Sequence, residues 1–163
     1  NPVPDQANGA GPSGSIQTNP HSVDFGSAQF VSIGAMSPDE LYGAGPVSMA
    51  NVTGRTSTQV DFPPRVWQRN SIAQRFYLLD NPQAFCLFGN QLRFYPDQNP
   101  TAGQVDAGSA FDLLALNAQP QGTPFELSPA SLDRNVVLNW SVIFTEGGES
   151  VDFEQEVLIR NVP

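Results

Sequence analysis

The chain of 163 residues contains no lysine, one cysteine, one histidine and no long apolar run. All seven basic residues are arginine, against sixteen acidic residues, so the net charge is −9. This acidic balance repels phosphate backbones and anionic lipids, so we expect no binding to nucleic acid or to a membrane surface. Because no run approaches the roughly 20 apolar residues of a membrane helix, membrane contact requires a segment outside these residues.

The single cysteine and the single histidine limit the possible chemistry. Cys86 alone excludes an internal disulfide and a cysteine-based zinc cluster, and we interpret it as an inert small hydrophobic residue. His21 lies beside Pro20 in a polar stretch, where we interpret it as a solvated loop residue. Without a second histidine, neither a catalytic triad nor a histidine-rich metal site is expected.

Acidic residues near the C-terminus are the remaining candidates for catalysis. Glu146 and Glu149 flank a Gly-Gly turn, and three further acids alternate along the next segment: Asp152, Glu154 and Glu156. A carboxylate pair is the chemistry of glycoside hydrolysis. Their regular spacing instead favours one solvated strand face, so we expect that the protein is not an enzyme and has no catalytic residues.

A turn-rich loop over residues 96–110 carries oxygen ligands that suit calcium. With the next strand included, the candidates are Asp97, Asn99, Asp106 and Asp112. They do not match the EF-hand pattern, because glycine is absent at its sixth position. Calcium is therefore an alternative to simple loop solvation, and we expect no other cofactor.

The 14 glycines and 15 prolines favour many short strands joined by turns over long helices. We expect a flexible arm or linker over residues 1–22 and one mainly β domain over residues 23–163. The short strands expected before the first hairpin are Val23–Phe25, Phe30–Ile33, Val47–Val52 and Gln59–Phe62. A single helical turn begins at Ser37, a strand spans Phe111–Leu116, and a loop follows it to Ser131.

Two hairpins give the strongest β signals. In residues 74–95, a Gly-Asn joint at 89–90 sets Phe85 opposite Phe94 and Leu87 opposite Leu92. In residues 136–160, pairing across Gly147-Gly148 places nearly all large apolar side chains on one face, as a half-buried sheet requires. We expect the two hairpins to build one antiparallel sheet.

Three segments resemble the soluble domain of MshO-type minor pilins, from the mannose-sensitive haemagglutinin type IV pilus system. Residues 75–86 are similar to that family's RFxxxDxPVxYxC segment, and residues 89–95 approximate its GxLxRY strand. Residues 111–116 are similar to its LLA strand, and residues 147–163 to its GGExVxLxHxVxVxNVP ending. The family's second cysteine is missing near residues 122–125, so the resemblance implies that Cys86 is half of a lost disulfide.

This resemblance implies a prepilin-like or pseudopilin domain that takes part in type IV pilus assembly, near the filament tip, through contacts with other pilin subunits. The family's N-terminal hydrophobic helix is absent from these 163 residues. Through such a helix the protein would be anchored in the bacterial inner membrane before assembly, and found at the cell surface or in the periplasm.

Two other functions remain open. One is a secreted β-sandwich carbohydrate-binding or adhesin module, in which Trp67, Tyr77 and Tyr95 form a sugar-stacking surface and a glycan is the partner. Ordinary packing of these aromatic residues in a β-sheet is the alternative interpretation of the same side chains. The other is a β-sandwich protein of a filament or capsid, which the Pro/Gly-rich N-terminal stretch suggests.

Overall fold

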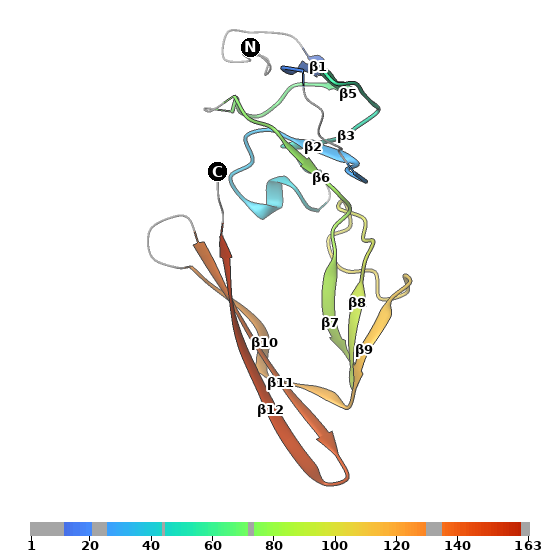
Figure 1. The fold of residues 1–163 in the computed structure, drawn as a ribbon, viewed down its shortest axis with the longest axis vertical. Coiled ribbons are helices and arrows are strands. Elements are labelled where there is room, and N and C mark those ends of the chain that lie inside the picture. Colours follow the sequence, from blue (N-terminus) through green and yellow to red (C-terminus); the bar gives the residue numbers. More distant parts are fainter. Residues whose placement is uncertain (1–11, 21–25, 44, 72–73, 130–134, 161–163) are drawn as a thin grey trace. The chain divides into compact units, whose positions relative to one another are not determined.

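A computed structural model describes residues 12–20, 26–43, 45–71, 74–129 and 135–160. Within these ranges the protein is mainly β, with strands in four three-stranded antiparallel sheets (Figure 1). The prediction of a mainly β fold is confirmed. The chain forms two compact units, residues 1–83 with 96–109 and residues 84–95 with 110–163, which we describe separately.

In its described residues the first unit contains six short strands and the 3-10 turn Pro38–Glu40. The strands are β1 Ser13–Gln17, β2 Phe30–Ser32, β3 Met49–Asn51, β4 Gly54–Arg55, β5 Gln59–Arg65 and β6 Tyr77–Leu79. They pair as β1-β5-β4 and β3-β2-β6. The core beneath these sheets consists of Ile16, Val31, Ile33, Ala50, Val60, Phe62 and Trp67. The Phe62 and Trp67 rings pack edge to face with centroids 5.3 Å apart.

The expected arm over residues 1–22 contains a strand of this unit, which corrects our interpretation of the segment. Strand β1 pairs with β5, and Ile16 is fully buried in the core. Strand β5 also continues through Pro63 and Pro64 to Arg65, beyond the expected end at Phe62. Both prolines are exposed. They lie where the β1–β5 register shifts and beyond the last residue of β5 that pairs with β4. The sheet therefore needs no backbone N–H donor at these two positions. The expected strand Val23–Phe25 lies outside the described residues.

The second unit contains two further sheets. The first, β7-β8-β9, consists of Ala84–Phe88, Gln91–Tyr95 and Asp112–Leu116. The second, β10-β11-β12, consists of Ala118–Pro129, Asn135–Glu146 and Glu149–Arg160 (Figure 1, orange to red). The prediction that residues 23–163 form one domain stays a prediction, because compact units can belong to a single domain.

Both predicted hairpin registers are confirmed. Phe85 pairs with Phe94 and Leu87 with Leu92, while Val142 pairs with Phe153. Positive φ angles supply the primed turns: +61° at Gly89 in the first hairpin, and +62° and +89° at Gly147 and Gly148 in the second. The alternation of apolar and polar residues, together with the position of each turn, was therefore sufficient to predict which residues pair across each hairpin.

The two hairpins do not share one sheet, contrary to our expectation. Each acquires its own third strand, because β9 pairs with β8 and β10 pairs with β11. Strand β10 occupies residues that we interpreted as a loop. The sheets meet instead through the buried side chains of Leu92, Ala118 and Val142. One backbone hydrogen bond, from Ala118 N to Asn90 O at 3.1 Å, lies beside this core.

We expect Gly89→Ala to destabilise the protein by about 1–2 kcal/mol, because a left-handed φ is unfavourable for any residue with a Cβ. Gly103→Ala is the matched control: Gly103 has no left-handed φ, and a Cβ added there would meet no atom within 4 Å, so its replacement should change stability by less than about 0.5 kcal/mol. Urea unfolding followed by tryptophan fluorescence measures both. Equal stabilities of the two variants would contradict the turn assignment.

Candidate functional site

One side of the β10-β11-β12 sheet carries an apolar surface that the described residues of the second unit leave open. We expected this side to be buried, but within the second unit only Val142 and Ala118 are fully covered. Phe125, Trp140 and Phe144 pack against them and are half-buried. Leu127 of β10 and Val151 of β12 are each 65% exposed. We call its open or half-buried members the apolar face: Phe125, Leu127, Leu138, Trp140, Val151, Phe153 and Val157. The polar Gln155, opposite Trp140, lies among them on the same side. Clusters of apolar side chains that are open to this extent mark interaction surfaces.

Aromatic rings form the centre of the apolar face. Trp140 of β11 stacks on Phe125 of β10, with centroids 6.3 Å apart, and meets Phe153 of β12 edge to face at 5.1 Å. The Trp140 Nε1 donor is buried and has no acceptor among the described residues. Because rigid aromatic side chains carry much of the binding energy of protein interfaces, this cluster is the part of the face best suited to hold a partner.

The other side of the same sheet is acidic. Asp152, Glu154 and Glu156 are exposed on β12, and none forms an ion pair with another described residue. This confirms a solvated strand face at these positions. Glu146 and Glu149 pair directly across the turn and are also exposed.

The structure gives local roles to three of the four calcium candidates. Asp97 Oδ1 accepts a hydrogen bond from the Asn81 amide, and Asn99 Oδ1 accepts bonds from Thr101 N and Oγ1 at 2.9 and 2.8 Å. Asp106 Oδ1 accepts from Gly108 N at 2.9 Å. The Asn99 and Asp106 oxygens therefore shape their own turns, whereas Asp97 joins its loop to the turn at Asn81.

The fourth candidate, Asp112, belongs to β9 in the second unit, where it pairs with Phe94. In the part of the chain that the structure describes, no group of three or more histidine, cysteine or acidic side chains is placed to hold a metal ion. Asp97 and Asn99 line one open hollow of about 490 Å³, but Asp97 is the one carboxylate among its lining residues. The described residues therefore bring no set of carboxylates together for calcium.

Gln98 organises the 96–110 loop, a role that we did not predict. Its buried side chain accepts a hydrogen bond from Asp106 N and donates one to Ser109 Oγ, both at 2.8 Å. Its backbone N–H donates to Pro82 O at 2.9 Å. A single glutamine in a loop forms no sequence pattern that predicts a structural role. The role of Gln98 is visible only from its hydrogen bonds.

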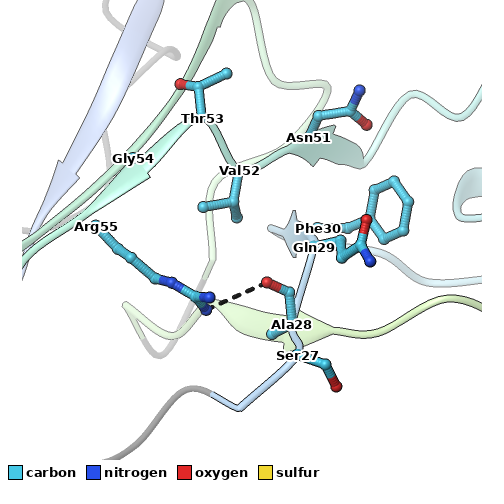
Figure 2. Close-up of a pocket in the computed structure, with 9 residues that line it drawn as sticks. All are labelled: Ser27, Ala28, Gln29, Phe30, Asn51, Val52, Thr53, Gly54 and Arg55. Atoms are coloured by element: carbon cyan, nitrogen blue, oxygen red, sulfur yellow. Dashed lines mark hydrogen bonds between the residues drawn. The ribbon is translucent and has the colours of Figure 1, made fainter.

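The first unit has an open hollow of about 610 Å³, lined by Ser27, Ala28, Gln29, Phe30, Asn51, Val52, Thr53, Gly54 and Arg55. Figure 2 shows the Arg55 guanidinium reaching the Ala28 carbonyl. It donates to Ala28 O and to Gly26 O, each at 3.3 Å. Arg55, the one charged residue that lines the hollow, is therefore engaged in holding the segment 26–28. The hollow then has no set of convergent polar groups for a ligand.

The aromatic residues considered for sugar stacking are not displayed together. Trp67 is 2% exposed and Tyr95 is fully buried, whereas Tyr77 is 47% exposed. Packing therefore accounts for Trp67 and Tyr95, as the alternative interpretation held. A surface of all three rings for a sugar is excluded.

Cys86 is a free, half-buried thiol on β7, opposite Arg93. Burial raises the pKa of this thiol, which lowers the fraction of reactive thiolate at neutral pH. We expect Cys86 to react with Ellman's reagent more slowly than free cysteine at pH 7.5, and at the free rate once the protein is unfolded in guanidinium. A native rate equal to that of free cysteine would contradict the inert role.

The strongest charged cluster joins Glu40 to Arg69 in the first unit. Arg69 Nη1 lies 2.6 Å from Glu40 Oε1 and 2.7 Å from Oε2. Met36 N and Ser48 Oγ donate to Oε2 at 3.1 and 3.0 Å. The hydrogen bond from Arg69, followed by that from Met36, lowers the pKa of Glu40 below its ordinary value.

This lowered pKa makes stability depend on pH. The stabilisation is present above the ordinary glutamate pKa of about 4.3 and is lost as pH falls through the lower pKa of the folded state. We expect Glu40→Gln to lose less stability than the wild type between pH 6 and pH 3, measured by urea unfolding. Asp39→Asn, at the adjacent exposed position, is the control and should follow the wild type. A Glu40→Gln profile parallel to the wild type would contradict this assignment.

No family model, curated protein or solved structure matches the chain. The described residues include no helix long and apolar enough to cross a membrane. The likeness to minor pilins therefore rests on the residues quoted for it, and the apolar face is the observation from which a function is argued.

Proposed function

We propose that the protein is the soluble domain of a minor pilin or pseudopilin, a structural subunit that takes part in assembly of a type IV pilus of the mannose-sensitive haemagglutinin kind. Its work is protein–protein contact near the filament tip, with other pilin subunits as partners. The observation that carries the proposal is the apolar face of the β10-β11-β12 sheet.

The energetics of the apolar face support a contact role. Fully burying one exposed leucine, valine or phenylalanine side chain contributes about 1.5–3 kcal/mol. Leu127, Val151 and Phe153 are exposed on one side of the same sheet, so a single partner surface can cover them together. An apolar helix of the kind that the resemblance implies has a surface suited to such a face.

The positions of the family-like segments also support the proposal. The residues similar to the GxLxRY strand and the LLA strand, and the described part of the ending, fall on β8, β9 and β12 in the second unit. The segment 75–86 instead runs from β6 of the first unit to β7 of the second. The segments on β8, β9 and β12 are distant in sequence but belong to one compact unit, the unit that carries the apolar face. In this proposal the protein is anchored in the inner membrane before assembly and then resides in the pilus, at the bacterial cell surface or in the periplasm.

We expect Leu127→Glu, introduced into the full-length gene of the producing bacterium, to reduce the amount of the protein recovered with sheared surface pili, because a charge on the apolar face opposes burial. Glu126→Gln, one residue earlier and on the opposite side of the sheet, should leave recovery unchanged. Quantitative immunoblots of sheared and whole-cell fractions separate lost assembly from lost protein.

Two results would overturn the proposal. The first is a wild-type protein that never enters the sheared fraction and whose deletion leaves the number of pili unchanged. The second is an open reading frame with a conventional cleaved signal peptide directly before Asn1, in place of a prepilin leader and an apolar helix. Saturable binding on a glycan array without pilus incorporation would favour the carbohydrate-binding alternative.

A further inference from the structure

Arg93 lies in the middle of strand β8, on the side of the β7-β8-β9 sheet away from the core. Its neighbour Leu92 is buried against Ala118 and Val142, and successive side chains of a strand point to opposite sides. Arg93 pairs with Cys86 on β7 and with Leu113 on β9. The half-buried Arg93 side chain therefore lies on the opposite side of this sheet, beside the buried Tyr95, with strands on both flanks.

Two aromatic rings hold the guanidinium. The Arg93 Cζ atom lies 4.5 Å from the Phe88 ring centroid and 4.1 Å from that of Phe111. These cation–π contacts hold the Cζ atom against the two rings and leave the N–H groups of Arg93 as the donors that a further partner would bind. A guanidinium fixed in this way loses little freedom when it binds a planar anion.

The in-plane donors are only partly used. Nε donates to Gln91 Oε1 at 2.7 Å, and Nη1 makes a long contact of 3.4 Å with the hydroxyl of Tyr95. Among the described residues Nη2 has no hydrogen-bond acceptor, and Arg93 has no carboxylate partner. In a chain with sixteen acidic and seven basic residues, this cation has no anion beside it in the part of the chain that the structure describes.

Exposed apolar side chains surround this cation. Phe88 is 52% and Phe111 40% exposed, and Leu113 and Leu116 are similarly open. Leu116 pairs with Gln91 and Leu113 with Arg93, so both lie on the same side of the sheet as the guanidinium. The result is one charged group among apolar and aromatic side chains, a combination that small binding sites use.

We propose that Arg93 binds a carboxylate that a partner protein presents on a peptide segment, next to an apolar side chain. The carboxylate would take the in-plane N–H donors of Arg93, and the apolar neighbour would cover Phe111 or Leu113. Phosphate-rich ligands fit less well, because the net charge of −9 repels polyanions. Sugar rings fit less well, because the guanidinium already occupies a face of each phenylalanine. The site uses residues outside the apolar face and does not depend on the pilin assignment.

The test titrates the whole chain with the peptide Ac-Val-Asp-Phe-Glu-Val-NH2 and with its neutral analogue Ac-Val-Asn-Phe-Gln-Val-NH2, following the Arg93 side-chain resonance by NMR. We expect the acidic peptide to shift that resonance and to bind about five-fold or more tightly than the analogue, the effect of an ion pair of about 1 kcal/mol. Gln91→Glu should lower the affinity for the acidic peptide by about five-fold or more, because it places a competing carboxylate at Arg93 Nε. Arg75→Gln, at an exposed arginine of the first unit, should have no effect.

Equal affinity of the two peptides, or no shift at millimolar peptide, would overturn the proposal. So would an unchanged affinity in the Gln91→Glu variant, whose folding is checked by its thermal melting. Binding of free sialic acid at Arg93 with no binding of the acidic peptide would also overturn it, by assigning the site to an acidic glycan.

Discussion

The packing of Ala118 and Val142 against Leu92 is the contact on which the second unit depends. Its two sheets share no strand, so side-chain burial at this point, with one backbone hydrogen bond beside it, holds them together. Strands β11 and β12 are each 12 residues long and extend well beyond this small core. The apolar face is therefore open because the chain supplies strands longer than the surface that covers them.

Local pattern was sufficient to predict the hairpins, because glycines that tolerate positive φ and a periodicity of two act over a few residues. It was insufficient for the sheets. Strand β10 contains Pro120, Gly122 and Pro124, which indicate a loop, yet an edge strand with a shifted register accommodates them. Strand β1 was missed similarly, because its pairing with β5 depends on residues more than 40 positions away.

The candidate site was harder to predict than the fold. Alternation identifies which side chains share a face, but burial depends on what covers that face, and here Leu127 and Val157 are exposed. The acidic residues of the 96–110 loop suggested a metal site. The sequence cannot show that a backbone N–H group, such as that of Gly108, already donates to a carboxylate oxygen, here that of Asp106. The roles of individual arginines could not be predicted from composition either. Arg69 forms an ion pair with Glu40, whereas Arg65 donates a hydrogen bond to the Met49 carbonyl.

The row of carboxylates on β12 also governs how the protein behaves at high concentration. Strand β12 is the outer strand of its sheet, and an open strand edge is a template for pairing with another copy. Two such edges side by side would bring Asp152, Glu154 and Glu156 of each copy together, and their mutual repulsion opposes this. The acids thus oppose edge-to-edge association of the protein, and concentrated salt weakens this opposition by screening their charges.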